Sequence, residues 1–346
     1  MKERAARRCL VGPTIIAIAI ALSTLTLAGG QEPGERRVRL DTLNVQDTVY
    51  HLSDGGGNTL VFLDEDSAEP GVVLIDTKLP GWGESMLELI GQITDLPVKT
   101  IINTHAHPDH AGSNGDFPTA TQIIAHENTR AHMVAYSGAN AAGLPTTTFT
   151  DRFSLLEGFD RIELYYFGPA HTDGDIVVVF PEKRVAYLGG LFPDKAVPVI
   201  DRDLGGSALA FPETLAKVVA GIQGVQRVDT REAAQAPERV QRTFNRDAGT
   251  LITGHGPFPT TYAGRGRREQ GSNVPWGTFM TWDDLAEYAD FNREFLEIVT
   301  AAHDGGHSVD QAMADLTQNL PDRYADYGMD HARANVEMIY AELGDK

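Results

Sequence analysis

Cysteine is almost absent from this sequence. The chain has one cysteine in 346 residues, and this is Cys9, close to the N-terminus. If the first 30 residues are removed, as argued below, no cysteine remains. Its absence excludes a disulfide framework, thiolate metal ligands and a cysteine nucleophile.

Basic residues are also scarce. The sequence has 29 lysines and arginines against 48 aspartates and glutamates, which gives a formal net charge of −19. A surface of this sign repels phosphate backbones, so we do not expect nucleic acid as a partner. With 42% hydrophobic residues and 35 glycines, the composition is that of a globular protein with many loops.

The first 30 residues have the organisation of a secretory signal peptide. Basic residues precede an apolar run over 10–28, and small residues follow it. This pattern predicts cleavage after Gly30 and a secreted or periplasmic protein. The run is also about long enough to cross a bilayer, so an uncleaved anchor is the alternative. We expect no stable membrane association unless the segment is retained.

Short apolar runs between turn residues follow from Val38 onward. Such runs predict strands, and among them are 98–103, 121–125, 176–180 and 185–188. Helical spacing of apolar residues occurs at 82–96, 128–133 and 212–221. The order of these elements predicts an α/β fold that begins with antiparallel strands.

The sequence changes character after Trp276. Apolar residues recur at helical spacing over 282–303, Ser308 has the position of an N-cap, and a last helix is expected over 330–343. These helices either pack on the main domain or serve a partner. The predicted organisation is a signal peptide over 1–30, a main domain over 38–265 and a helical extension over 276–346. A charged segment, 227–249, is interpreted as a surface insertion.

The stretch Ile101–Gly112 reads IINTHAHPDHAG and follows directly on a predicted strand. His105 and His107 are two residues apart, so on an extended backbone their side chains point the same way. His171 and His255 also follow strand-like runs and lie beside glycine or alanine. Imidazole and carboxylate are ligand types that zinc accepts.

These residues can be divided between two neighbouring metal sites. The imidazoles of His105, His107 and His171 would hold one zinc ion and leave a coordination position open, as in catalytic sites. A second ion beside it could be held by Asp109, His110 and His255.

The run His105–His110 resembles the HxHxDH signature of the metallo-β-lactamase superfamily. His171 in GPAHTDGD and His255 in TGHGP are similar in order and spacing to the two remaining histidines of that family. The segment GVVLIDTKL is similar to the family's strand before its first helix. The resemblance covers Val38–Pro259, about two thirds of the chain. It implies an αββα sandwich with the metal ions at one edge of its two sheets.

One position departs from the family pattern. Most members carry an aspartate or cysteine in a context similar to Gly189-Gly190-Leu191-Phe192, where this chain has Gly190. Neither Gly190 nor Leu191 can bind a metal ion. The ligand set therefore resembles that of the cysteine-free metallo-β-lactamase subclass, whose second zinc uses Asp, His and His. A weakened second site, or substitution by Asp194, are the alternatives.

The resemblance implies a zinc-dependent hydrolase in which a metal-bound hydroxide attacks the carbonyl of an ester, lactone, amide or β-lactam. Asp109 is the expected catalytic residue, because it would orient the water and carry its proton. Two zinc ions per chain and a small-molecule substrate are expected, and the oligomeric state stays open. The alternatives are a β-lactamase proper, or a non-catalytic module with one metal that has lost the bridging carboxylate.

Other polar residues near these motifs have a structural interpretation beside a functional one. Asp76 is expected to be a buried hydrogen-bonding group. Asp173 and Asp175 are expected to support the turn that carries His171 rather than to bind metal. His126 is expected to pack or cap at a helix start, and Lys195 to lie in a solvated loop, with binding of a substrate carboxylate as the alternative.

Overall fold

The computed structural model describes residues 39–42, 49–53, 55–120, 122–138, 141–193, 195–225, 250–252, 279–280 and 282–344. The predicted signal peptide and the insertion at 227–249 lie outside these ranges, as do His255 and Asp194. Among the described residues, no helix is both long and apolar enough to span a bilayer.

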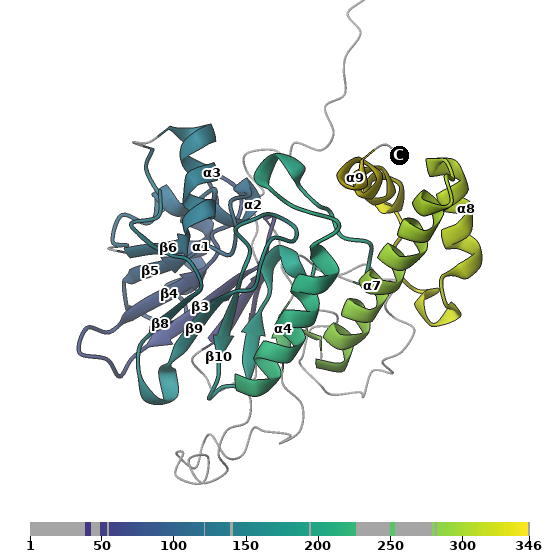
Figure 1. Ribbon diagram of the computed structural model, residues 1–346. Coiled ribbons are helices and arrows are strands. Elements are labelled where there is room, and N and C mark those ends of the chain that lie inside the picture. The colour runs from purple at the N-terminus through teal and green to yellow at the C-terminus, as the bar shows by residue number, and fades with distance from the viewer. Residues whose placement is uncertain are drawn as a thin grey trace, which may run out of the picture. The chain divides into compact units, whose positions relative to one another are not determined.

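Two β-sheets form the centre of the fold (Figure 1). The first contains, in spatial order, β1 (Arg39–Thr42), β2 (Val49–Ser53), β3 (Thr59–Asp64), β4 (Gly71–Ile75), β5 (Val98–Ile102), β6 (Gln122–His126) and β7 (Thr147–Phe149). Its strands are antiparallel from β1 to β4 and parallel from β4 to β7. The sequence therefore predicted the antiparallel start correctly, whereas β7 was not anticipated.

The second sheet contains, in spatial order, β13 (Phe279–Met280), β12 (Thr250–Ile252), β11 (Val185–Tyr187), β10 (Ile176–Phe180), β9 (Ile162–Tyr166) and β8 (Arg152–Leu155). Only β11 and β12 pair in parallel among these described strands. The neighbouring strands β8 and β9 form an antiparallel hairpin.

Helices flank the two sheets, and the last of them pack on other helices. They are α1 (Gly83–Ile90), α2 (Pro108–Ala111), α3 (Glu127–Ser137), α4 (Phe211–Val225), α7 (Trp282–Asp304), α8 (Val309–Asn319) and α9 (Ala332–Leu343). Short 3₁₀ turns are η1 (Asn114–Asp116), η2 (Gly158–Asp160), η3 (Gly189–Leu191), η4 (Arg202–Leu204) and η6 (Asp322–Tyr324). The helix expected over 82–96 ends earlier than predicted, and the histidine run itself contains α2.

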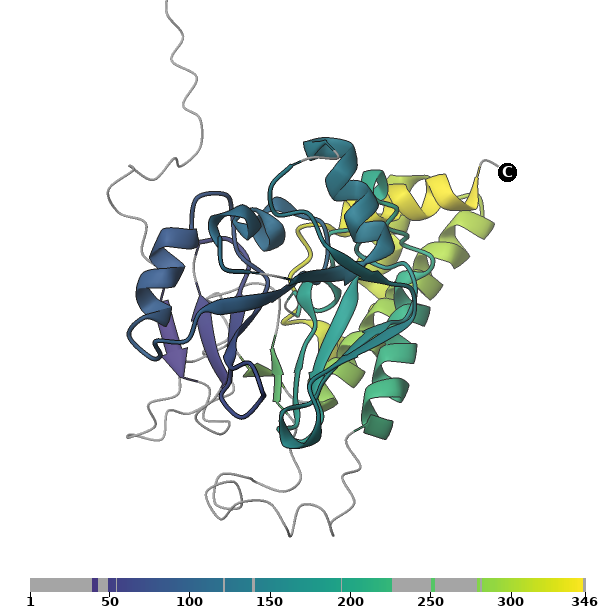
Figure 2. The same ribbon diagram turned by 90° about the vertical axis from the view of Figure 1, so that its left-hand side faces the viewer.

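Alternation along the strands explains the layers. Successive side chains of a strand point to opposite faces of the sheet. Residues of one parity fill the space between the sheets, among them Phe62, Ile102 and Val178. Their neighbours of opposite parity face outward, where Val61 packs with α1 and Val177 with α4 and α7. Figure 2 shows α1 on one side of the paired sheets and α4 and α7 on the other, which confirms the αββα sandwich.

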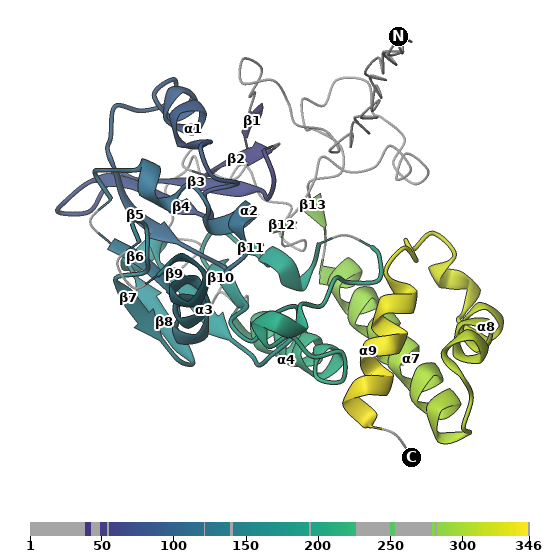
Figure 3. The same cartoon turned by 90° about the horizontal axis from the view of Figure 1, so that it is seen from above.

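The C-terminal helices are part of this packing. Fully buried aromatic side chains of α7, such as Tyr288 and Phe291, lie in the same apolar cluster as Phe211 of α4. Ser308 begins α8 with a reciprocal capping box to Gln311. Of the two alternatives, the described helices pack on the main domain, as Figure 3 shows from above.

Parallel strands bring the chemistry to one edge. The carboxyl ends of β4, β5 and β6 meet there, because Asp76 N donates to Ile102 O (2.8 Å) and Asn103 N to Ile124 O (2.9 Å). Ile176, the first residue of β10, donates its N–H to Thr104 O (3.0 Å). This bond joins the second sheet to the same edge, so the loops that follow β5 and precede β10 lie together.

Substitution of Phe291 tests whether the helical extension and the sandwich fold as one unit. Phe291→Ala removes a fully buried ring that contacts Tyr288, Tyr324 and Tyr327. We expect the free energy of unfolding to fall by about 3–5 kcal/mol in a single transition, measured by denaturant unfolding. Leu343→Ala, at a position 36% exposed, is the matched control and should change it by no more than about 0.5 kcal/mol. A separate early transition that leaves the main one unshifted would contradict this.

Candidate metal centre

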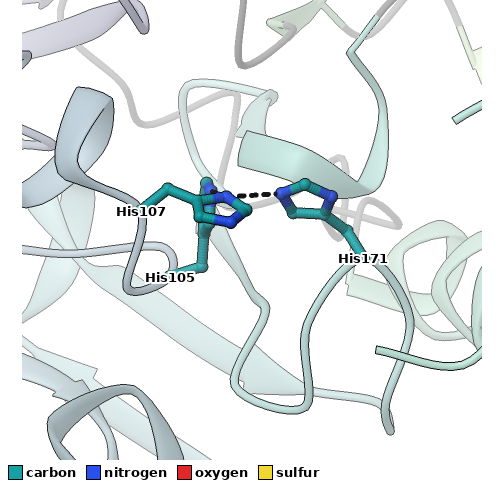
Figure 4. A group of neighbouring side chains, drawn as sticks. All are labelled: His105, His107 and His171. Atoms are coloured by element: carbon teal, nitrogen blue, oxygen red, sulfur yellow. Dashed lines mark hydrogen bonds between the residues drawn. The ribbon is translucent and has the colours of Figure 1, made fainter. Parts of the chain in front are cut away.

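Three of the predicted ligands lie together at the strand edge. His105 follows β5, His107 is the residue immediately before α2, and His171 lies in the loop between β9 and β10. Figure 4 shows the three rings turned toward one another. In the part of the chain that the structure describes, they form the one group of three or more side chains placed to hold a metal ion.

The distances between their nitrogens fit a small tetrahedral ion. Nδ1 of His107 lies 3.1 Å from Nε2 of His105 and 2.9 Å from Nε2 of His171. Ligand nitrogens of a tetrahedral zinc with bonds of about 2.05 Å lie roughly 3.3 Å apart. The three side chains would therefore have to separate by only a few tenths of an ångström to hold such an ion.

The outer nitrogens of two rings face groups that can only accept hydrogen bonds. Nδ1 of His171 lies 2.7 Å from the carbonyl oxygen of Val199, and Nε2 of His107 lies 2.8 Å from a carboxylate oxygen of Asp201. Each outer nitrogen must therefore carry the proton. In the neutral imidazole the opposite nitrogen then has a free lone pair, and that nitrogen faces the cluster.

The third ring is fixed through a hydroxyl group. Thr104 Oγ1 donates to Asp76 Oδ2 (2.7 Å), so it accepts the hydrogen bond from Nδ1 of His105 at 3.0 Å. This arrangement leaves the lone pair of His105 Nε2 toward the cluster. All three lone pairs consequently converge on one point, which a cation stabilises, and the donor set fits a metal ion.

Asp76 connects this site to the next histidine. Its buried carboxylate accepts from Thr104 N and Oγ1, and it also lies 2.7 Å from Nδ1 of His110. The residue has a φ of +63°, a conformation that few non-glycine residues adopt. Asp76 is thus a buried hydrogen-bonding group beside the ligands, as the sequence indicated.

His110 and Asp109 lie next to the three converging rings. The ring of His110 is 4.2 Å from that of His105, and its Nε2 is 3.7 Å from a carboxylate oxygen of Asp109. Burial opposes the charged form of His110, but the bonded Asp76 outweighs it and raises the pKa above its usual value. His255, the third predicted ligand of a second ion, lies outside the described residues.

Gly190 lies directly against the metal centre. A Cβ built on it would be 2.2 Å from Cδ2 of His171, closer than any side chain allows. Leu191 is buried in the apolar cluster under α4 and α7. Neither residue brings a carboxylate to the site, and Asp194 lies outside the described residues. As long as His171 keeps its orientation, there is therefore no room at position 190 for a side chain that could carry a bridging carboxylate.

The two aspartates after His171 bind protein groups. Asp173 lies 2.7 Å from Nε2 of His132 on α3. Asp175 is buried and accepts hydrogen bonds from the backbone and hydroxyl groups of Thr172 (2.7 and 2.9 Å). Burial raises the pKa of Asp175 to about 7. Both residues support the turn, in agreement with the structural interpretation.

Two further candidates have structural partners away from the cluster. Nδ1 of His126 caps α3 by accepting from Asn128 N (3.3 Å), and Nε2 donates to Thr150 O (2.9 Å). Burial lowers the pKa of His126, which favours the neutral ring. Lys195 is not a solvated lysine, because its Nζ lies 2.6 Å from the carboxylate of Asp284 on α7.

Sequence reasoning missed Asp201. Its Oδ2 holds His107, while its Oδ1 accepts from the backbone N–H groups of Asp203 and Leu204 at the start of η4. An aspartate followed by a turn and Gly205-Gly206 does signal a cap. No local pattern, however, relates it to a histidine 94 residues earlier.

Comparisons with known proteins agree with this geometry. The sequence model of the metallo-beta-lactamase superfamily matches residues 52–255. The 2,4-dinitroanisole O-demethylase subunit alpha of Nocardioides sp. (strain JS1661) is 33% identical over 164 residues, 46% of this chain and 48% of that protein. The metallo-beta-lactamase type 2 of Bacteroides fragilis is 28% identical over 152 residues, 42% of this chain and 58% of that protein. The chain thus spans about half the length of these curated relatives.

A solved structure shares the fold. The metallo-beta-lactamase from Pontibacter korlensis aligns with a TM-score of 0.51 at 17% identity, over 74% of this chain and 99% of that one. At this identity the likeness concerns the fold alone.

Removal of the Asp201 carboxylate tests the hydrogen-bonding pattern. In Asp201→Ala, Nε2 of His107 loses its acceptor and the ring is free to adopt the other tautomer. We expect zinc affinity, measured by competition with a chromogenic chelator, to fall about 10- to 100-fold. Asp203→Ala removes a neighbouring carboxylate that bonds to none of the three histidines and should leave the affinity within about twofold. Equal affinities of the two variants would refute the assignment.

Proposed function

The chain belongs to the metallo-β-lactamase superfamily, and from this premise we propose that it is a zinc-dependent hydrolase of a small-molecule ester, lactone, amide or β-lactam. The observation that carries the proposal is the convergence of three imidazole lone pairs on one point. The members of this superfamily are mostly hydrolases. A single open position beside three histidines is the arrangement of catalytic rather than structural zinc.

Zinc bound there would supply Lewis acidity, which lowers the pKa of water and polarises a substrate carbonyl. The protein's own contribution is orientation. The three rings are held by Val199, Asp201 and Thr104. Each ring thereby keeps its proton on the outer nitrogen. We assign to Asp109, whose side chain is 28% exposed, the role of accepting the proton of an attacking water.

We propose a second zinc ion held by Asp109, His110 and His255. The support is that Asp76 occupies Nδ1 of His110 and leaves Nε2 facing Asp109. Because Gly190 provides no carboxylate, this site should bind its ion more weakly than the first. A single-metal module without catalysis remains the competing interpretation.

Three exposed apolar side chains come from segments next to the site. Leu79, Tyr136 and Val199 are among the large apolar side chains with notable exposure, at 39%, 50% and 47%. The hydroxyl of Tyr136 donates to Ala106 O, and the carbonyl of Val199 accepts from His171. Leu79 packs at Gly56, which also borders Asp109. We propose that these side chains border the substrate, which favours an uncharged molecule with an apolar acyl group or ring.

We also propose that the activity lies in the periplasm or outside the cell, on the basis of the N-terminal 30 residues.

A substrate panel on the zinc-loaded protein tests the proposal. It contains p-nitrophenyl acetate and octanoate, a γ-lactone, nitrocefin, and 2,4-dinitroanisole because of the O-demethylase relative. We expect chelator-sensitive turnover of at least one substrate, restored by zinc. His107→Ala should lower kcat/KM by at least about 100-fold, because it removes a ligand.

The matched control is His307→Ala, since His307 is exposed and pairs with Asp315 far along the chain. It should retain full activity. Hydrolysis unchanged in His107→Ala would refute the site. One tightly bound metal ion with no turnover on any substrate would favour the single-metal module instead.

A further inference from the structure

The loop over 195–209 carries two of the three groups that fix the metal-binding histidines. Val199 O accepts from Nδ1 of His171, and Asp201 Oδ2 faces Nε2 of His107. The backbone of the same loop binds the loop of His171, because Asp201 N donates to His171 O (2.8 Å). The position of this loop therefore sets the orientation of both rings.

The first half of the loop is bound by the C-terminal helices and the turn between them. Nδ2 of Asn335 on α9 donates to Pro198 O at 2.7 Å, and both groups are buried. Val197 N donates to Gly328 O (2.8 Å), and Gly328 N donates to Lys195 O (3.0 Å). Pro198 immediately precedes Val199, so the bond from Asn335 lies one residue from the carbonyl that holds His171.

The second half of the loop is bound by the last turn of α9. The carboxylate of Glu342 accepts from Ser207 Oγ (2.6 Å) and from Ala208 N (2.7 Å). These two residues lie between Asp201 and the start of α4. Asn335 and Glu342 thus hold the loop on both sides of Asp201, from one helix.

Helix α9 is itself firmly packed. Val336 and Ile339 are buried in the cluster that α4, α7 and the outer face of the second sheet share. Seven residues, about two helical turns, separate Asn335 from Glu342, so both side chains lie on the same face of the helix. The matched region of the superfamily model ends at residue 255, well before this helix.

We infer that the C-terminal helical extension is a structural part of the metal centre: α9, through Asn335 and Glu342, positions the loop whose Val199 and Asp201 fix His171 and His107. The two residues are positioning residues, since neither touches a metal ligand. The inference rests on the metal centre and is independent of the reaction proposed above, because its test measures metal binding.

The experiment compares metal binding in full-length variants. Asn335→Ala, Glu342→Ala and the double variant are titrated with zinc against a chromogenic chelator, and their cobalt-loaded visible spectra are recorded. Each single substitution should weaken zinc binding about tenfold, the double variant more, and the cobalt spectrum should shift as ring orientation is lost. Unfolding temperatures and helix content are measured in parallel.

Glu337→Ala is the matched control on the same helix. Glu337 is exposed and its nearest basic partner is Arg333 at 3.8 Å, so this variant should bind zinc like the native chain. Glu342→Gln keeps one acceptor oxygen, so its zinc affinity should lie between those of the native chain and Glu342→Ala. This comparison serves as the readout if the double variant does not fold.

Two outcomes would overturn the inference. One is zinc affinity within twofold of the native chain in the single variants, together with an unshifted cobalt spectrum, even if their unfolding temperatures fall. The other is a loss in Glu337→Ala as large as in Glu342→Ala. A lack of hydrolysis in the substrate panel would refute the proposed reaction and would leave this result unchanged.

Discussion

The structure depends on one electrostatic constraint. Three imidazole rings are held so that their protons point outward, to Val199 O, Asp201 Oδ2 and Thr104 Oγ1, and their lone pairs point inward to one position. Lone pairs about 3 Å apart repel unless a proton or a cation lies between them. The outer hydrogen bonds hold each ring in place despite this repulsion. A divalent ion bound between the lone pairs would remove the repulsion. The partly exposed Asp109 lies beside His110, whose ring is 4.2 Å from that of His105.

The fold supplies the outer partners from distant parts of the chain. Asp76 and Thr104 follow the parallel strands β4 and β5, whose carboxyl ends share one edge, and the bond from Ile176 N to Thr104 O brings the second sheet to that edge. Close approach is possible at Gly190, where any side chain would displace His171. The loop that contains Val199 and Asp201 is held by α9. The helical extension thus helps to position the site, although it lies far from the histidines in the sequence.

The order of strand-like and helix-like runs predicted an α/β fold with an antiparallel start, and the resemblance to the superfamily implied the αββα sandwich. Continuous apolar runs such as Ile176–Phe180 indicate strands buried on both faces, and two histidines spaced by one residue after a strand specify a common direction. The N-cap at Ser308 could also be predicted, because its signal is local. The contact of Asp201 with His107 and the bond of Asn335 to Pro198 could not be predicted. They join residues 94 and 137 positions apart, and no local pattern relates them. Lys195 was misjudged for the same reason, since its partners lie on α7.

The central claim is that the three inward nitrogens bind one metal ion. A crystal structure of the zinc-soaked protein, with anomalous scattering recorded above and below the zinc edge, tests it most directly. The account predicts an anomalous peak about 2.0–2.1 Å from Nε2 of His105, Nδ1 of His107 and Nε2 of His171, while His107 keeps its contact with Asp201. A zinc peak bound through the opposite ring nitrogens, or no peak among the three side chains, would contradict it.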